Sequence, residues 1–256
     1  MKIGICELHP DLAPGSEAWS HFARQVSKEK PDIFLLNEMP FGSWISAGEK
    51  FVPETWKAAC DVHAKGISLL GELGAKVVLG SRATELEGRH VNEAFVWTKD
   101  GGLQGVHTKQ FFPNEAGYYE ARWFEPGDRH FHVVEAGSLR VGFLICTEVM
   151  FNEHARHYGR SGAHLIAVPR ATPRGTTRRW LTAMQMAAIV SGCYVVSSNR
   201  GGVDSSGQKF GGAGWVVDPI GDMMAQTSIS TPVVYYDLDT ELVAQAQREY
   251  PCNVKE

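Results

Sequence analysis

The spacing of apolar and polar residues along this chain predicts helices that alternate with strands. One segment, Ser16–Lys28, has the i, i+3, i+4, i+7 spacing of a helix with one buried face, at Trp19, Phe22, Ala23 and Val26. The same reasoning predicts helices at Ser16–Lys28, Thr55–Leu73, Asn152–Gly159 and Thr177–Ser191.

Short apolar or alternating runs separate these helices and predict strands. The run Asp32–Leu36 is continuously apolar after its aspartate, which is typical of a strand buried on both faces. The predicted strands are Lys2–Glu7, Asp32–Leu36, Lys76–Gly80, Val91–Thr98, Leu103–His107, His130–Glu135, Leu139–Ile145, His164–Val168, Tyr194–Ser198, Gly214–Asp218 and Val233–Asp237. The segment Lys99–Gly102 has the composition of a hairpin turn.

The order of these elements predicts an α/β fold with mixed sheets, because strands joined by helices alternate with strands joined by hairpins. At least ten strands are many for one open sheet. Two sheets packed face to face with helices outside would hold them. No repeat or linker interrupts the pattern, so we expect one domain over residues 1–256.

Composition narrows the classes of function. The chain is 43% hydrophobic and 21% charged, with a net charge of −4, so neither disorder nor a nucleic-acid surface is expected. No apolar run approaches the ~18 residues of a membrane span, and the apolar run at the N-terminus is short for a signal peptide. The five cysteines are spread singly, which favours free thiols in a reducing compartment. We therefore expect a cytoplasmic protein without membrane or nucleic-acid partners.

Two reactive side chains follow buried strands. Glu38 comes after Asp32–Leu36, and Cys146 is the first residue past the apolar run Val141–Ile145. Active sites of α/β folds tend to lie at the carboxyl ends of strands, where Glu38 could act as a base and Cys146 as a nucleophile. Glu38 could equally cap a turn, and a free cysteine often behaves as a small core residue.

Two further charges stand in unusual surroundings. Lys109 precedes the aromatic pair Phe111-Phe112, and Glu120 lies in a loop with Tyr118, Tyr119 and Trp123. An acid among aromatic rings suggests a pocket wall. The alternatives are a surface lysine and an ordinary loop carboxylate.

The order and context of Glu38, Lys109, Glu120 and Cys146 resemble the nitrilase superfamily of carbon–nitrogen hydrolases. The likeness rests on four motifs, which are Asp32–Pro40, Thr108–Pro113, Gly117–Glu120 with Pro126–Asp128, and Gly142–Glu148. The family's downstream pattern is also similar to residues of this chain, at Trp180, Met184-Gln185, Ala188, Asn199-Arg200 and Gly211-Gly212. Asn152 stands where the family usually has proline, which is favoured but not required at a helix start.

The resemblance implies a four-layer α-β-β-α sandwich that forms homodimers or larger homo-oligomers. It also implies hydrolysis of a small amide or N-carbamoyl compound through a cysteine thioester, with no metal or cofactor. In that reaction Cys146 is the nucleophile, Glu38 the base, and Lys109 with the backbone N–H of Thr147 the oxyanion site. Glu120 would hold Lys109 and the substrate in register.

The walls of the pocket are predicted from residue type. Phe112, Tyr118, Tyr119 and Trp123 would make it apolar, and Arg170 would bind an anionic group. Arg170 belongs to a cluster with Arg174, Arg178 and Arg179, which could instead form a solvated or interface patch. If the cluster faces the pocket, it favours a neutral or anionic substrate over an amine.

Other readings remain open. A nitrilase would use the same four residues on a nitrile. A Cys–His hydrolase would need one of the ten histidines, and a non-catalytic binding protein could share the fold. The pairs His130/His132 and His154/His157 have spacings that fit metal ligation, but neither has a third ligand nearby in sequence.

Overall fold

Six strands form the first of two sheets at the centre of the molecule. The computed structural model describes residues 1–128 and 130–255. The first sheet has the order β13-β1-β2-β3-β4-β5, with β1, β2 and β3 parallel and the others antiparallel to their neighbours. Its strands are β1 (Lys2–Leu8), β2 (Ile33–Leu35), β3 (Val77–Leu86), β4 (Arg89–Thr98), β5 (Gly102–Thr108) and β13 (Val233–Asp237).

The second sheet is also mixed. Its order is β12-β11-β9-β8-β7-β6, with β7, β8 and β9 parallel. Its strands are β6 (Val134–Ala136), β7 (Leu139–Phe143), β8 (Leu165–Arg170), β9 (Tyr194–Val203), β11 (Trp215–Val217) and β12 (Met223–Gln226); β10 (Lys209–Gly211) pairs with the far end of β9.

The two sheets meet along a short hydrogen-bonded seam. There Glu7 and Leu8 of β1 pair with Asn199 and Arg200 of β9 in parallel register. Away from this seam the sheets face each other across a shared core that includes Ile5 and Val141. The seam brings the carboxyl ends of parallel strands from both sheets to one edge of the molecule.

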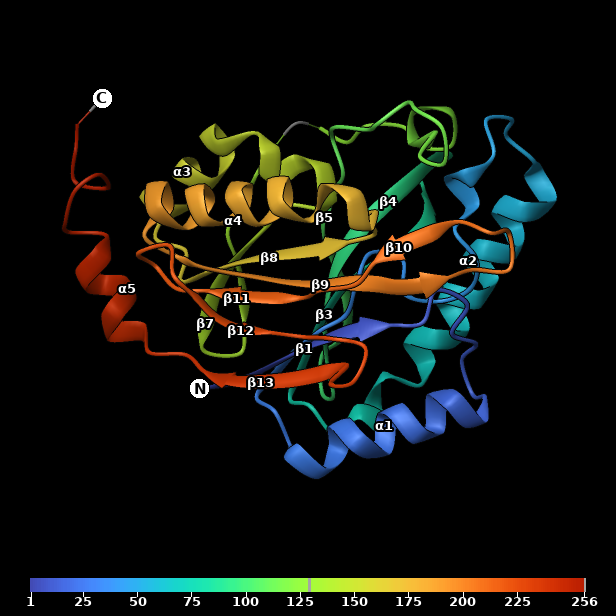
Figure 1. Cartoon of the computed structure of the whole chain (residues 1–256), viewed down its shortest axis with the longest axis horizontal. Coiled ribbons are helices and arrows are strands. Elements are labelled where there is room, and N and C mark those ends of the chain that lie inside the picture. Colours follow the sequence, from blue (N-terminus) through green and yellow to red (C-terminus); the bar gives the residue numbers. More distant parts are fainter. Residues whose placement is uncertain (129, 256) are drawn as a thin grey trace.

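Helices cover the outer faces of both sheets, as Figure 1 shows. Helix α1 packs on the outer face of the first sheet through Trp19 and Val26, and α3 and α4 pack on the second sheet. The helices are α1 (Glu17–Glu29), α2 (Pro53–Ser68), α3 (Asn152–Arg160), α4 (Thr177–Ser191) and α5 (Thr240–Ala246). The predicted four-layer sandwich with two mixed sheets is confirmed.

Local sequence accounts for the helix ends. Ser16 caps α1, and its hydroxyl accepts a hydrogen bond from the backbone N–H of Trp19 at 3.1 Å, an interaction that typically stabilises a helix by ~1 kcal/mol. Helix α3 begins at Asn152, so the helix forms without the proline.

Two predicted elements differ from the structure. The strand predicted at His130–Glu135 is wrong in its first part: β6 begins at Val134. Phe131 instead lies against the ring of His154, with centroids 3.7 Å apart, and this packing explains its apolar character without strand pairing. The helix predicted at Thr55–Leu73 ends at Ser68 and is followed by a separate 3₁₀ turn, Leu70–Leu73.

Several short elements had no clear signal in the sequence. Helix α5 has seven residues, of which only Val243 and Ala246 are buried, so its periodicity is too brief to recognise. Strands β10 and β12 are also short.

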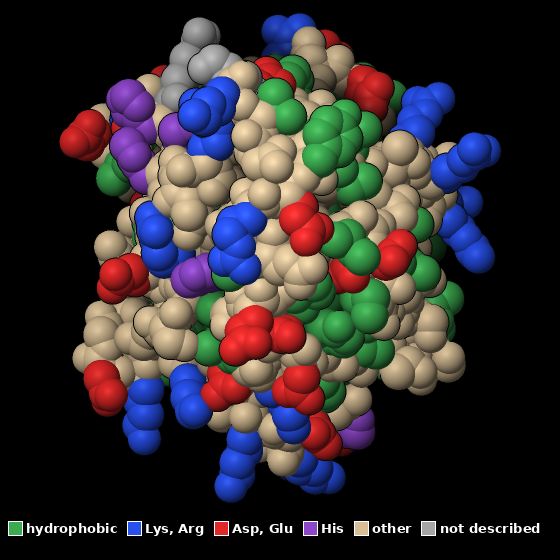
Figure 2. Space-filling view, turned by 90° about the vertical axis from the view of Figure 1, so that its left-hand side faces the viewer, with side chains coloured by type: hydrophobic (Ala, Val, Ile, Leu, Met, Phe, Trp, Pro, Cys, Tyr) green, Lys and Arg blue, Asp and Glu red, His purple; other side chains and the backbone are tan. Residues whose placement is uncertain are grey.

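Basic and acidic side chains are interspersed over the face that carries α5 (Figure 2). No helix among the described residues is long and apolar enough to pass through a membrane.

Candidate active site

The loops after β2 and β8 hold the two sheets together beside the site. The backbone N–H of Glu38 donates to the carbonyl of Arg170 at 3.2 Å. Arg200, at the end of the seam, donates from its guanidinium to the carbonyls of Glu38, Met39 and Gly42. The loop carrying Glu38 is therefore fixed by contacts with the other sheet.

Lys109 joins two carboxylates in the interior. Its Nζ donates to Oε1 of Glu38 at 2.7 Å and to Oε2 of Glu120 at 2.5 Å. Its exposed fraction is 0%. Asn92 also donates to Oε1 of Glu38, at 2.9 Å. The structure thus brings together an acid from each of two loops and a lysine from the end of β5.

This arrangement shifts the proton equilibria. Burial alone disfavours the ammonium of Lys109, but the charges of Glu120 and Glu38 outweigh it and hold the pKa of Lys109 above its usual range. Burial also raises the pKa of Glu120, with Lys109 opposing this effect and Glu38 adding to it. Lys109 therefore remains a cation, while Glu120 holds a proton more readily than an ordinary glutamate.

Cys146 lies three residues beyond the end of β7, at the start of the 3₁₀ turn Cys146–Met150. Its φ is +52°, a left-handed conformation that side chains other than glycine adopt at some cost in energy. Burial raises the pKa of its thiol well above the usual range, and the charge of Glu38 raises it further, against the effect of Lys109. The thiol therefore needs a base to become a nucleophile.

A third buried acid, Glu148, connects the backbone next to Cys146 with the backbone next to Lys109. Its Oε2 accepts hydrogen bonds from the backbone N–H of Ile145 at 2.7 Å and from Nε2 of His107 at 2.9 Å. Its Oε1 accepts from the backbone N–H of Gln110 at 2.7 Å. Glu148 thus fixes the residues that adjoin Cys146 and Lys109. Sequence reasoning assigned Glu148 to the nucleophile motif but gave it no role; an acid two residues after the cysteine was the available signal.

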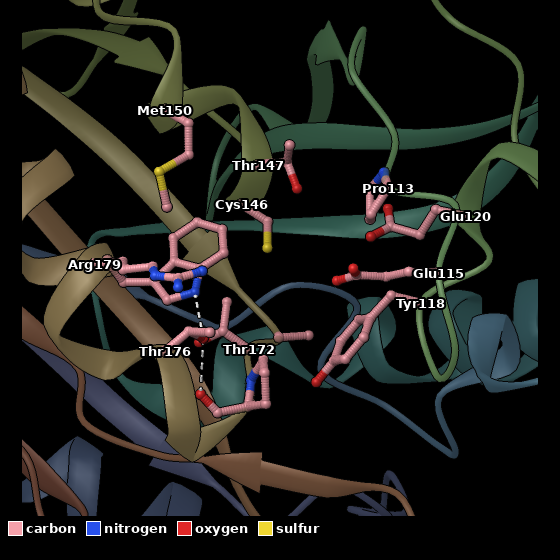
Figure 3. A pocket seen from close by; sticks show the side chains of 13 residues that line it. Pro113, Glu115, Tyr118, Glu120, Cys146, Thr147, Met150, Thr172, Thr176 and Arg179 are labelled. Carbon is pink, nitrogen blue, oxygen red and sulfur yellow. Dashed lines mark hydrogen bonds between the residues drawn. The ribbon is translucent and has the colours of Figure 1, made fainter.

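A cavity of about 170 Å³ opens in front of Cys146. Figure 3 shows the Cys146 sulfur directed into it, with Tyr118 and Glu120 on one side and Met150 and Arg179 on the other. The residues that line it are Pro113, Glu115, Tyr118, Glu120, Cys146, Thr147, Met150, Ala171, Thr172, Pro173, Thr176, Arg179 and Trp180. This volume is below the ~300–1,000 Å³ of common ligand pockets, so the cavity suits only a small molecule.

Of the residues predicted to contact the substrate, Tyr118 and Thr147 line the cavity. Phe112 lies behind the lysine, with its ring centroid 5.9 Å from Nζ of Lys109. Trp123 is buried and donates from its indole to the carbonyl of Gly48 at 2.7 Å, and the backbone N–H of Tyr119 donates to the carbonyl of Ser46. These three residues shape the loop behind the cavity and do not line it.

Arg170 lies beneath the cavity instead of in its wall. Its guanidinium donates to Oγ1 of Thr172, Oγ of Ser197 and the carbonyl of Ala213, and it stacks 4.1 Å from the ring centroid of Trp215. Burial lowers its pKa to about 9. Arg170 supports Thr172, which lines the cavity, and among the four clustered arginines Arg179 is the one that faces it.

Comparison with known proteins identifies the family. A family model described as carbon-nitrogen hydrolase matches residues 2–248. The chain belongs to the carbon–nitrogen hydrolase family. The omega-amidase NIT2 of Bos taurus is 26% identical over 235 residues, covering 89% of this chain and 84% of the relative. The N-carbamoylputrescine amidase of Arabidopsis thaliana is 26% identical over 251 residues, covering 90% and 83%.

A solved structure has the same fold. The carbon-nitrogen hydrolase from Helicobacter pylori G27 matches with a TM-score of 0.86 at 24% identity, covering 99% of this chain and 94% of that chain. The family model confirms the resemblance to the nitrilase superfamily of carbon–nitrogen hydrolases, and the relatives with amidase names make amide hydrolysis the general chemistry to test.

The histidine pairs of this carbon–nitrogen hydrolase lie outside the cavity. His130 and His132 stack with ring centroids 5.1 Å apart, and both line a separate pocket together with His154 and His157. Among the described residues, no group of three or more His, Cys, Asp or Glu side chains is arranged to hold a metal ion.

Proposed function

We propose that this carbon–nitrogen hydrolase cleaves the carbon–nitrogen bond of a small amide or N-carbamoyl compound through a thioester on Cys146. The observation that carries the proposal is the buried pair of hydrogen bonds from Lys109 to Glu38 and Glu120, next to a cysteine that points into a small cavity. The amidase names of its relatives support the same chemistry.

The first half of the reaction would form the thioester. Glu38 takes the proton of the Cys146 thiol while the sulfur bonds to the substrate carbonyl carbon. The oxyanion that develops is stabilised by the ammonium of Lys109 and by the backbone N–H of Thr147. The carbon–nitrogen bond then breaks, and Glu38 returns its proton to the leaving nitrogen.

The second half would release the acyl group. Glu38 takes a proton from water, the hydroxyl bonds to the thioester carbon, and the carbon–sulfur bond breaks. The proton on Glu38 then returns to the Cys146 sulfur, so the enzyme is restored and one water is consumed. Oε2 of Glu38 accepts no hydrogen bond from any described residue, which leaves one carboxylate oxygen available for these transfers.

Glu120 would keep Lys109 in place through both halves. Its Oε2 accepts the 2.5 Å hydrogen bond from Lys109, whereas its Oε1 has no partner among the described residues. Because Glu120 also lines the cavity, Oε1 can accept a hydrogen bond from the substrate amide.

The test is ammonia release from a panel of small amides, N-carbamoyl amines and nitriles. We expect wild-type protein to release ammonia from an amide or carbamoyl compound, and Cys146→Ala to release none. Mass spectrometry of quenched wild-type protein should show an acyl group on Cys146. Cys252→Ala is the matched control, because Cys252 is a half-buried thiol that does not line the cavity.

Two results would contradict the proposal. Hydrolysis by Cys146→Ala at the wild-type rate would exclude the thioester. Turnover of nitriles alone would assign the same residues to nitrile hydrolysis.

A further inference from the structure

Two charges of opposite sign line the cavity on either side of Cys146. Figure 3 shows Arg179 on one wall and Glu115 on the opposite wall, with the cysteine between them. Neither charge has an ion-pair partner within 4.0 Å among the described residues. Both charges are therefore available to a bound molecule.

The position of Arg179 is unfavourable for the helix that carries it. It lies in the first turn of α4, which contains no acidic residue. The amino end of a helix carries partial positive charge and favours anions, so an arginine there adds repulsion to the helix. Together the helix end and Arg179 form a positive wall that attracts a carboxylate.

Glu115 is held on a tight turn at the other wall. Its backbone N–H and carbonyl both pair with Tyr118, and Gly117 adopts a φ of +82° within the turn. The carbonyl of Gly117 accepts a hydrogen bond from the indole of Trp44 at 3.0 Å. The Glu115 carboxylate therefore stands on a braced loop, where it can bind an ammonium group.

We infer that the substrate carries both an ammonium and a carboxylate, bound by Glu115 and Arg179, at the end remote from its amide or ureido group. Its chemical class is thus an amino acid whose side chain ends in a carboxamide or a urea. This inference rests on the proposed function, because it takes Cys146 as the reacting end. The two charges of such a substrate cancel, which agrees with the expectation of a neutral or anionic substrate. The ammonium group is new, and it follows from Glu115, which that expectation did not consider.

Binding to the Cys146→Ala protein tests the inference without turnover. Four matched probes are glutamine, 4-aminobutanamide, glutaramate and butanamide, which carry both charges, the ammonium alone, the carboxylate alone and neither. A second set of probes with a urea group is citrulline, N-carbamoylputrescine, 5-ureidopentanoate and butylurea. A hydrogen bond to a charged group typically changes affinity by ~10-fold or more, so we expect each charge to tighten binding about 10-fold in at least one set.

Each wall is tested separately by one variant in the same background. Arg179→Gln should lose the ~10-fold gain from the carboxylate and keep the gain from the ammonium. Glu115→Gln should do the reverse. The controls are Arg178→Gln, a neighbouring arginine that does not line the cavity, and Glu153→Gln, an exposed acid in α3.

The outcomes separate the two proposals. Absence of binding, equal affinity for all four probes in both sets, or equal effects of Arg178→Gln and Arg179→Gln would overturn the inference. Charge-dependent binding without ammonia release from any probe by wild-type protein would contradict the proposed function, and with it the claim that the bound molecule is a substrate. It would still support Glu115 and Arg179 as the residues that bind the two charges. Hydrolysis without charge preference would support the proposed function and overturn the inference.

Discussion

Replacing Glu148 by glutamine changes one atom of a side chain that joins the backbone next to Cys146 to the backbone next to Lys109. The carboxylate accepts three hydrogen bonds, from the backbone N–H groups of Ile145 and Gln110 and from Nε2 of His107. A glutamine has one carbonyl oxygen and one NH₂ group. If its oxygen keeps the two bonds at Oε2, its NH₂ faces the N–H of Gln110, and two donors meet.

The magnitude follows from the bonds that are lost. A hydrogen bond to a charged group contributes ~1.5–3 kcal/mol, and a buried donor left without a partner costs ~1–3 kcal/mol. Glu148 is 0% exposed, so water does not replace the lost partner. We expect Glu148→Gln to lower the free energy of unfolding by ~3 kcal/mol. A domain whose free energy of unfolding is ~5–15 kcal/mol remains folded after such a loss.

Activity should fall more than this stability loss explains. Gln110 adjoins Lys109, and Ile145 adjoins Cys146, so a shift at Glu148 moves the cation relative to the sulfur. Misplacement of reacting groups by ~1 Å can cost ~10²-fold in rate. We expect kcat to fall by about that factor, with a smaller change in KM, because the cavity residues themselves remain.

Urea unfolding and steady-state kinetics on the best substrate would measure both effects. Glu153→Gln, an exposed acid five residues further along the chain, is the control and should change stability by less than ~0.5 kcal/mol. A Glu148→Gln protein as stable and as active as this control would refute the bracing role of Glu148. A loss of stability with unchanged kcat would show that Glu148 stabilises the fold but does not position Lys109 and Cys146.

Three further predictions address the site and the core. Glu38→Gln keeps the shape of the side chain but removes its basicity, so we expect kcat to fall by at least ~10²-fold in ammonia release; near-normal turnover would exclude Glu38 as the base. Lys109→Met should reduce kcat by ~10²–10³-fold with less effect on KM. It should also lower the free energy of unfolding measured in urea, because it leaves two buried carboxylates without their cation. A rise in KM alone would make Lys109 a binding residue. Burial lowers the pKa of His63 to about 4, against ~6.5 in an unfolded chain. The unfolded state therefore takes up the proton first as pH falls. The contribution of His63 to the free energy of unfolding is fully present above pH ~6.5 and is lost as pH falls towards ~4. His63→Leu should therefore lose ~2–3 kcal/mol less than wild type between pH 7 and pH 4.5 in urea unfolding, and equal losses would contradict the assignment.

Much of the architecture could be predicted from the sequence because burial leaves a local periodicity. The helix at Ser16–Lys28 and the strands around Asp32–Leu36 and Leu139–Ile145 lie within a few residues of their predicted bounds. Each of them packs an apolar face that neighbouring positions already reveal. The polar residues at the ends of two such strands, Glu38 and Cys146, were candidates for the same reason.

The contacts that bring the site residues together could not be predicted in that way. The 2.5 Å hydrogen bond between Lys109 and Glu120 depends on how the connection after β5 folds back on itself, although the resemblance to the family anticipated that these residues act together. The role of Glu148 depends on backbone groups of Ile145 and Gln110, which carry no side-chain signal in the sequence.

The cavity wall shows the same distinction most clearly. By sequence, Arg170 and Arg179 are equivalent members of one basic cluster, and Glu115 is an ordinary loop acid. In the structure Arg170 ends a strand whose two faces are both covered, so its guanidinium is buried on Trp215. Arg179 lies on the first turn of a helix that faces Glu115 across the cavity. The residue pattern along the chain was enough to predict which segments are buried and which reactive groups they carry. The packing of the two sheets decided which charges line the cavity, because that depends on contacts between segments far apart in the chain.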